Sequence, residues 1–369
     1  MRLVKLPAVS LFKPLENSFP SLARGQPALI LAPMEGVTDA PMRALMTERG
    51  GFRYCVSEFL RVSSEVPPAK VFLGHVPELK KNCQTDAGCP VQIQILGGDP
   101  ERMARAANLA YQIGARAIDI NFGCPAPTVN RHDGGATLLK YPDRIFAIVK
   151  AVRDALPKEI PVSAKMRLGW DTQEPILLNA ERAAEAGAAW ITIHGRTKMQ
   201  GYMPPAYWRP IGEVRKRVSI PIVANGDIWS FEDFLRCQEE TGAEHFMLGR
   251  SALADPNLVY RISEALGSPV PHAPQAPLEI KPFGVNRAEW VPLLLRFIEL
   301  SEPYTDHPRY LLARIKQWMR LVFVSRKIDW FDTLKRLESL DEVFALLEGR
   351  SAFASAEMIK GSECQTLSL

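Results

Sequence analysis

At 369 residues the chain exceeds the usual size of one compact core, so we expect one large domain and a smaller one. Hydrophobic residues make up 47% of the sequence and charged residues 23%, which excludes a chain that is disordered along most of its length. The net charge of +4 is too small to establish a nucleic-acid partner, although it favours a polyanion over an acidic surface.

The N-terminal residues 1–26 carry Arg2 and Lys5 before a short apolar stretch, which Pro7 and Lys13 interrupt. No small-residue cleavage site follows, so we predict a loosely ordered extension and not a signal peptide. No run in the sequence approaches the roughly 18 to 20 apolar residues that cross a bilayer. The cysteines form no CxxC pair and no metal-ligand spacing with histidine, so we expect no disulfide framework and no metal site. A cytoplasmic location fits best, because thiols stay reduced there.

Short β-branched runs begin at Ala28 and alternate with longer amphipathic stretches, a pattern typical of βα units around a parallel sheet. Eight such runs predict an α/β fold, a TIM (β/α)8 barrel that spans residues 27–267. The predicted strands are Ala28–Ala32, Tyr54–Ser57, Val91–Leu96, Ala117–Ile120, Val162–Lys165, Trp190–Ile193, Ile222–Ala224 and His245–Leu248.

Helices are predicted between most of these strands. The gap between the second and third strands, residues 59–89, contains Pro67, Pro68 and Pro77. Because proline interrupts helix hydrogen bonding, no single helix is expected there. The predicted helices are Ala40–Arg49, Pro100–Gln112, Asp143–Ala155, Glu174–Ala186, Tyr207–Lys216, Phe231–Glu240 and Asn257–Leu266.

The pattern of the sequence changes after the barrel. Residues 268–284 are dense in proline and are predicted to form a linker. Residues 285–348 repeat apolar residues at helical spacing, as at Trp290 and Leu294, which predicts a small all-helical C-terminal domain. Residues 349–369 lose this pattern and are predicted to form a flexible tail.

Polar and glycine residues follow the predicted strands, at the end of a TIM barrel where chemistry takes place. Loops after the seventh and eighth strands commonly offer backbone N–H groups to a phosphate, and Arg250 can neutralise its charge. We therefore expect a phosphorylated cofactor there; the alternative is that the glycines only turn the chain. The residues in these two loops are Asn225, Gly226, Asp227, Gly249 and Arg250.

Lys165 and His194 end adjacent predicted strands, so both side chains can point at one ligand. A histidine alone is more often a satisfied structural residue. A lysine with apolar neighbours is harder to explain without a ligand, because burying an unpaired ammonium is costly. We predict that Lys165 meets an electron-rich ring or an anion.

Cys124 lies in the loop after the fourth predicted strand, where glycine and proline hold the backbone. Cysteine is ordinarily a small buried filler, but this loop lies on the catalytic face. An ordinary thiol, with a pKa of about 8.5, is mostly protonated near neutral pH, which suits a general acid better than a nucleophile. His132 is the nearest candidate base in the sequence, and we place no weight on it.

Six stretches in one order resemble the tRNA-dihydrouridine synthase family, over about residues 28 to 347. They are APMEGVTDAPMR, INFGCPAPTVNRHDGGATLL, SAKMRLGW, ITIHGRTKMQGY, VANGDI and FMLGRSAL. The resemblance implies an FMN-binding barrel joined to a helical tRNA-binding domain. It also implies reduction of a uridine in tRNA to 5,6-dihydrouridine, with NADPH as the reductant.

The resemblance implies roles for residues of the catalytic face. Cys124 would protonate C5 of the uracil while hydride from the flavin reaches C6. His194 would lie beside the flavin, and Gln94 and Lys165 would contact its ring. Pro33, Met34 and Glu35 would line the flavin, and its phosphate end would be held by Asn225, Gly226, Asp227, Gly249 and Arg250.

The segment RYLLARIKQWMRLV in the helical region is basic. It places Arg314, Lys316 and Arg320 within two turns of helix, with Trp318 between them. A basic helix can hold phosphates, and we favour RNA binding for these cations over a merely solvated face. For Trp318 we favour a place in the core.

Segments such as GHVPELK and ARIKQW look most like the C-type bacterial subfamily, which acts on position 16 of the tRNA D-loop. Under that resemblance Arg61, Asn121 and Arg167 would bind tRNA together with residues of the ARIKQW helix. The N-terminal extension and the tail lie outside the resemblance.

Two other functions stay open at this point. Flavin barrels that act on small molecules, such as dihydroorotate dehydrogenases, share the scaffold but have no use for a basic helical domain. An RNA-binding protein that keeps the barrel as a scaffold would not need a candidate at every cofactor position. Because one tRNA and one active site need no symmetry, we expect a monomer, and the sequence does not distinguish NADPH from NADH.

Overall fold

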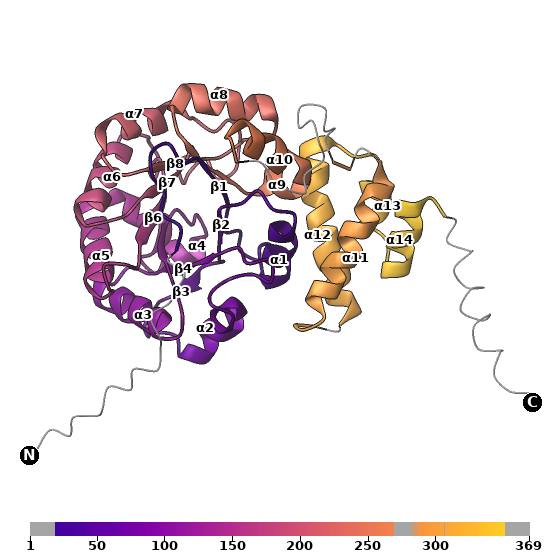
Figure 1. The fold of residues 1–369 in the computed structure, drawn as a ribbon, viewed down its shortest axis with the longest axis horizontal. Coiled ribbons are helices and arrows are strands. Elements are labelled where there is room, and N and C mark those ends of the chain that lie inside the picture. The colour runs from indigo at the N-terminus through magenta and orange to yellow at the C-terminus, as the bar shows by residue number, and fades with distance from the viewer. Residues whose placement is uncertain (1–18, 269–282, 285, 306, 351–369) are drawn as a thin grey trace, which may run out of the picture.

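The computed structural model describes residues 19–268, 283–284, 286–305 and 307–350. Within them a closed barrel of parallel strands is surrounded by helices, and a second group of helices packs beside it (Figure 1). The predicted fold class, a TIM barrel followed by C-terminal helices, is confirmed. The predicted linker lies almost entirely outside the described residues, as do the extension before Phe19 and the tail beyond Arg350.

Eight strands of the described residues close the barrel, each paired in parallel with its neighbours. The order around the barrel is β1, β2, β4, β5, β6, β7, β8 and β9, and β9 returns to β1. Each corresponds to a predicted strand. Their bounds are β1 (Ala28–Leu31), β2 (Tyr54–Val56), β4 (Val91–Leu96), β5 (Ile118–Phe122), β6 (Val162–Arg167), β7 (Ile191–His194), β8 (Ile222–Asn225) and β9 (His245–Leu248).

A further short strand, β3 (Leu60–Arg61), extends the barrel wall and is not predicted by the sequence pattern. It pairs with the carboxyl end of β4, where Arg61 lies opposite Leu96. Two residues are too few for an alternating pattern to appear. The rest of this gap contains α2 (Ala69–His75) and η1 (Pro77–Lys80), so the expectation that no single helix spans it is confirmed.

The helices that cover the barrel begin at residues suited to helix starts. The side chain of Asp39 accepts a backbone N–H at the start of α1 (Ala40–Glu48), and Ser230 and Asp233 form a capping box at α8 (Phe231–Thr241). Short α4, η2 and α9 are additional to the predicted helices. The remaining bounds are α3 (Pro100–Gln112), α4 (Pro127–Asn130), η2 (Gly135–Lys140), α5 (Pro142–Asp154), α6 (Ile176–Glu185), α7 (Arg209–Arg217), α9 (Arg250–Ala254) and α10 (Pro256–Ala265).

The interior of the barrel has two unlike halves. One half, the apolar wall, comes mainly from β1, β2, β8 and β9 and packs as one hydrophobic cluster that includes Ile30, Val56, Val223 and Met247. The other half, the polar wall, comes from β4, β5 and β6, and hydrogen bonds join most of its side chains. The polar wall consists of Gln92, Gln94, Asp119, Asn121, Ser163 and Lys165.

Phe19 and Leu22 close the floor of the barrel, the end opposite the catalytic loops. The ring of Phe19 lies 5.0 Å from that of Tyr54, at the start of β2, and 6.3 Å from that of Trp190, just before β7. Phe19 and Leu22 are both buried. The described end of the predicted loose extension, residues 19–26, therefore packs on the barrel, because its apolar side chains cover the floor.

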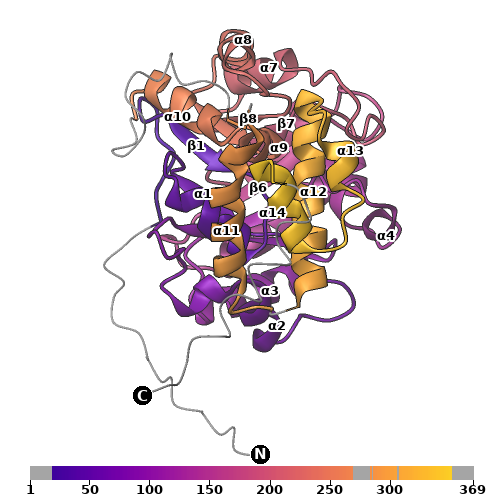
Figure 2. The same ribbon diagram turned by 90° about the vertical axis from the view of Figure 1, so that its right-hand side faces the viewer.

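The C-terminal helices pack against one side of the barrel, beside α1 and α9 (Figure 1, Figure 2). Trp318 of α12 is buried, which confirms its predicted core position, and its indole N–H donates to the carbonyl of Leu253 at 2.9 Å. Arg326 pairs with buried Asp255 at 2.6 Å. The bounds are η3 (Arg287–Glu289), α11 (Trp290–Ser301), α12 (Pro308–Arg326), α13 (Phe331–Leu334) and α14 (Leu340–Glu348).

The described residues contain neither a candidate membrane span nor a metal cluster. None of the helices in the described ranges is long and apolar enough to cross a membrane. Across these ranges no three His, Cys, Asp or Glu side chains gather as a metal site would require. The described cysteines, which are Cys55, Cys83, Cys89, Cys124 and Cys237, are free thiols.

Candidate active site

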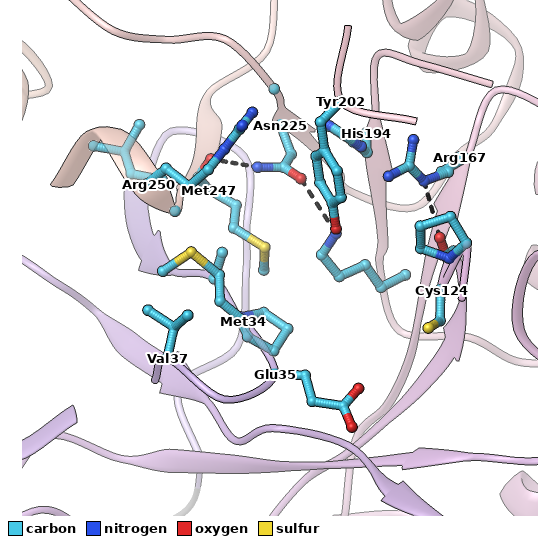
Figure 3. A pocket seen from close by; sticks show the side chains of 18 of the residues that line it. Met34, Glu35, Val37, Cys124, Arg167, His194, Tyr202, Asn225, Met247 and Arg250 are labelled. Atoms are coloured by element: carbon cyan, nitrogen blue, oxygen red, sulfur yellow. Dashed lines mark hydrogen bonds between the residues drawn. The ribbon is translucent and has the colours of Figure 1, made fainter. Parts of the chain in front are cut away.

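A cavity of about 550 Å³ opens at the carboxyl end of the barrel strands (Figure 3). This volume is in the range that holds a small organic ligand. Loops after β1, β5, β7, β8 and β9 form much of its wall. Every residue predicted to bind the cofactor lines it, namely Pro33, Met34, Glu35, Gln94, Lys165, His194, Asn225, Gly226, Asp227, Gly249 and Arg250.

Lys165 and Asn225 are joined by a hydrogen bond inside the cavity. The ammonium of Lys165 donates to Asn225 Oδ1 at 3.2 Å, and Asn225 Nδ2 donates to the carbonyl of Met247 at 2.8 Å. Burial lowers the pKa of Lys165 to about 8, while the negative charge of Asp119 acts in the opposite direction. One neutral amide is a weak partner for a buried ammonium, so this position favours a ligand that is anionic or electron-rich.

His194 is buried at the end of β7, among positive charges. Burial lowers the pKa of His194 far below its ordinary value, and the charges of Arg167 and Lys165 lower it further. The ring is therefore neutral near pH 7. A guanidinium nitrogen of Arg196 lies 3.4 Å from His194 Nε2 and can only donate, so the ring proton belongs on Nδ1.

Gly226 and Gly249 bring the backbone close to the cavity. Gly226 has a φ of +114°, and a Cβ there would lie 2.7 Å from the ring of His194, so no other residue fits without movement. A Cβ at Gly249 would lie 3.3 Å from Met34 Sδ. Arg250 follows directly at the start of α9, and its side chain is 27% exposed, so it can reach a ligand.

The carboxylate of Asp227 is occupied by protein partners. It pairs with buried Arg196 and accepts from the backbone N–H of Ala206 at 3.0 Å and the indole N–H of Trp229 at 3.2 Å. Arg250 lies 3.8 Å away. The carboxylate thus lies between the guanidinium groups of Arg196 and Arg250, and the residue lines the cavity, so its predicted contact with the cofactor stays a prediction.

Cys124 lies at one end of the cavity and Arg250 at the other (Figure 3). The backbone around the cysteine is held by Asn121, whose Oδ1 accepts the N–H groups of Gly123 and Cys124, each at 2.9 Å. Arg167 Nε donates to the carbonyl of Gly123 at 2.9 Å. The backbone on the N-terminal side of the cysteine is thus fixed, and Cys124 lines the cavity.

The thiol of Cys124 lies in an environment that keeps it protonated. Burial raises the pKa of Cys124, the charge of Glu35 raises it further, and the backbone N–H of Ala126 opposes the change. The pKa of Glu35 is itself raised by burial and by the charge of Glu58. A thiol that keeps its proton near neutral pH can act as a proton donor.

Tyr202 and Met247 line the cavity without having been predicted as site residues. Tyr202 is 57% exposed, and its ring lies 5.2 Å from the guanidinium of Arg167 and 5.0 Å from that of Arg250. Tyr202 lies in a loop, where no period marks it. Met247 alternates with Phe246 and Leu248 along β9, so the two-residue period of that strand is a signal that places it on the opposite face, toward the barrel interior.

The residues predicted to bind tRNA are spread over both parts of the chain. Asn121 and Arg167 line the cavity. Arg61 donates to the carbonyl of Thr128 at 3.0 Å, in the loop that follows the cysteine. On α12, Lys316 is half-buried and Arg320 is exposed. The next residue on this helix, Leu321, lines the cavity.

Arg314 differs from its prediction. Its side chain is 8% exposed and donates to the carbonyls of Gly36 and Val37, and it pairs with Asp39 at 2.9 Å. These partners belong to the loop between β1 and α1. Because the barrel engages its terminal nitrogens, Arg314 fixes α12 to this loop, and its charge is paired within the protein.

Comparison with known proteins gives one consistent family. Residues 30–308 match the family model described as Dihydrouridine synthase (Dus). The chain is 42% identical, over 86% of its length and 98% of the relative, to a tRNA-dihydrouridine(16) synthase of Pseudomonas syringae pv. tomato. Proteins of the same name from Neisseria meningitidis serogroup A and Shewanella oneidensis are each 41% identical. They match over 86% and 87% of this chain and 93% and 97% of their own length.

Among solved structures, histamine dehydrogenase from Rhizobium sp. 4-9 is similar, with a TM-score of 0.52 and 13% identity. The match covers 76% of this chain and 50% of that chain, so the present chain spans about half of that protein. At this identity the similarity shows the barrel fold alone. The family match and the relatives that are aligned over nearly their whole length show that this chain belongs to the dihydrouridine synthase family.

Proposed function

We propose that the protein reduces a uridine in the D-loop of tRNA, at position 16, to 5,6-dihydrouridine, with FMN in the cavity and Cys124 as the proton donor. The observation that carries this proposal is a cavity with Cys124, whose pKa is raised by burial, at one end and Arg250 at the other (Figure 3). The relatives named tRNA-dihydrouridine(16) synthase support the substrate and the position.

The cavity residues fit FMN. A phosphate needs N–H donors and a positive charge, and the Gly249 loop with Arg250 offers both. A flat ring system needs apolar cover and a cationic partner, which Met34, Met247 and Lys165 offer. The single amide partner of Lys165 leaves donor capacity for such a ring.

The chemistry that FMN would supply is hydride transfer from NADPH to C6 of the uracil. The residues of this chain supply the proton and the geometry. Cys124 keeps its proton at neutral pH and can deliver it to C5. Asn121 and Arg167 hold the backbone beside the cysteine, so the thiol stays at one place in the cavity.

A macromolecular substrate is supported by the position of α12, because Leu321 of this helix lines the cavity and exposed Arg320 precedes it. A uracil in folded tRNA must leave its stack to enter the cavity, which costs a few kcal/mol. Contacts of Arg320 and Lys316 with the tRNA backbone would offset that cost. A flavin enzyme for small molecules has no use for a basic helix at this place.

We expect a monomer, because one tRNA and one active site need no symmetry. The described cysteines are free thiols, which agrees with a reducing compartment such as the cytoplasm, where tRNA is modified.

The visible spectrum of the purified protein tests this proposal. We expect flavin absorbance that bleaches with NADPH in the absence of oxygen and returns when unmodified tRNA is added. Bleaching without recovery on tRNA would favour a flavin enzyme for a small molecule. A protein without flavin would favour the scaffold function.

A further inference from the structure

Asp119 is a buried carboxylate that the proposed reaction does not use. It lies on β5, two residues before Asn121 and on the same inward face, and it is 2% exposed. In the register of the barrel Asp119 is paired with Gln94 of β4 and with Ser163 of β6. Asp119 and Ser163 are not among the residues that line the cavity, so they form a layer beneath it.

A continuous chain of hydrogen bonds runs from Asp119 to the cysteine loop. Gln94 Nε2 donates to Asp119 Oδ2 at 2.7 Å, and Asn121 Nδ2 donates to Gln94 Oε1 at 2.9 Å. Asn121 Oδ1 in turn accepts the backbone N–H groups of Gly123 and Cys124. Two side-chain amides therefore separate the buried carboxylate from the backbone of the cysteine.

The direction of this chain is fixed at both ends. Backbone N–H groups can only donate, so the oxygen of the Asn121 amide must face them and its nitrogen must face Gln94. The oxygen of Gln94 then faces Asn121 and its nitrogen faces position 119. Only an acceptor can terminate the chain there, and an ionised carboxylate is a group that accepts without donating.

The second oxygen of Asp119 is fixed as well. Ser163 donates its hydroxyl to Asp119 Oδ1, and Gln92 Nε2 donates to Ser163 Oγ at 2.9 Å. Burial raises the pKa of Asp119, whereas the hydrogen bonds from Ser163 and Gln94 and the charge of Lys165 act in the opposite direction. The carboxylate thus meets donors at both oxygens, as a buried anion requires.

We propose that Asp119 is a positioning residue for Cys124: its carboxylate orients the amides of Gln94 and Asn121, and through them it holds the N–H groups of the cysteine loop. The orientation also leaves one N–H on Gln94 and one on Asn121 free to donate to a ligand in the cavity. The proposal rests on the proposed function only for its expected effect on turnover.

The substitution Asp119→Asn tests this chain of hydrogen bonds with little change in side-chain volume. The new side chain has one acceptor oxygen where the carboxylate has two and carries no charge, so the hydrogen bond from Gln94 weakens and the cysteine loop loosens. We expect kcat on tRNA to fall about tenfold, the loss of one charge-assisted bond, with KM for tRNA unchanged. A fall in melting temperature without a fall in kcat would overturn the proposal.

The pH dependence of Cys124 alkylation by iodoacetamide gives a reading that needs no tRNA. Glu35, Arg61 and Arg167 are the charged groups that influence this thiol, and burial is the largest cause of its raised pKa. A loosened loop exposes the thiol, so the alkylation midpoint of Asp119→Asn should move to lower pH, as mass mapping of the Cys124 peptide would show. An unchanged midpoint would contradict the proposal.

A double variant tests whether the chain passes through Gln94. Gln94→Glu alone sets two carboxylates face to face and should lower the melting temperature strongly. In Gln94→Glu/Asp119→Asn the new carboxylate accepts from both neighbouring amides, so the melting temperature should exceed that of Gln94→Glu and the alkylation midpoint should return toward that of the wild type. Losses that simply add would overturn the proposal.

Asp255→Asn is a matched control. Asp255 is also a buried carboxylate, but it pairs with Arg326 and Arg261 and is not part of the chain of hydrogen bonds that leads to Cys124. This substitution should lower the melting temperature and leave the Cys124 midpoint unchanged; an equal shift of the midpoint would show a general effect of instability and overturn the proposal. A wild type that is inactive on tRNA would reject the proposed function, while the alkylation midpoints would still decide the role of Asp119.

Discussion

The polar wall and the apolar wall of the barrel stand on neighbouring strands but are held by different forces. Ile30 and Val223 of the apolar wall are fully buried and are stabilised by burial and dispersion, which have no fixed direction. Gln94 and Asn121 of the polar wall each place one donor and one acceptor in a set orientation. A change in the apolar wall should therefore alter stability first, and a change in the polar wall should alter chemistry first.

The largest effect is expected at Cys124, which the polar wall holds. Cys124→Ala removes the proton donor, so kcat on unmodified tRNA should fall about 10²- to 10⁴-fold while flavin content and tRNA affinity stay unchanged. Single-turnover kinetics with pre-reduced protein measure this loss. Cys237→Ala is the control, because Cys237 is buried on α8 away from the cavity; full turnover in Cys124→Ala would disprove the donor role.

Ile30→Ala is the corresponding test of the apolar wall. The substitution leaves a cavity in a fully buried position, so the free energy of unfolding should fall by about 2–5 kcal/mol. Urea unfolding measures the loss, and kcat of the folded variant should stay close to that of the wild type. If kcat fell while stability was unchanged, the two walls could not be treated separately.

Arg250 follows β9, a strand of the apolar wall. A substitution there tests whether a polar group on that side of the barrel contributes to binding of the cofactor and not to the chemical step. Arg250→Ala should weaken flavin binding about 10- to 100-fold, since a hydrogen bond to a charged group contributes about 1.5–3 kcal/mol. Fluorescence titration with FMN measures the affinity. Arg236→Ala, at an exposed arginine of α8, should bind flavin as the wild type does, and equal losses in both would point to a non-specific charge effect.

The smallest effect is expected from the pH dependence of Lys165. Its folded-state pKa is lowered from 10.5 to about 8, so between these values the unfolded chain binds more protons. Stability of the wild type should therefore rise with pH across this window, relative to Lys165→Met. Unfolding at pH 7 and pH 9 compares the two; a difference that does not change with pH would show that Lys165 titrates normally.

The regular parts of the fold were predictable because their period is visible in the sequence. The bounds of β4 and β9 agree with the prediction, since each is a short run rich in apolar residues between turns. The residues at the carboxyl ends of the strands gather in one cavity because parallel strands end at one face. Strand β3, which carries Arg61, shows the limit of prediction from periodicity, because two paired residues leave no periodic signal in the sequence.

What could not be predicted depends on partners that are distant in the sequence. The sequence predicts Arg314 as part of a basic face, but its carbonyl and carboxylate partners lie on the loop after β1, and the carbonyl of Gly36 is 278 residues away in the sequence. The role of Asp119 likewise depends on the register that sets it between β4 and β6. A charge pattern tells which residues can bind, and only the packing tells what they bind.

The attachment of α12 to the barrel limits how the chain can recombine with its relatives. Arg314 holds the loop that also carries Met34 and Glu35 of the cavity, and Leu321 on the same helix lines that cavity. A chimera that takes the C-terminal helices from another member of the family would import a foreign partner for this loop. The loop between β1 and α1 and the helix α12 should therefore be inherited together.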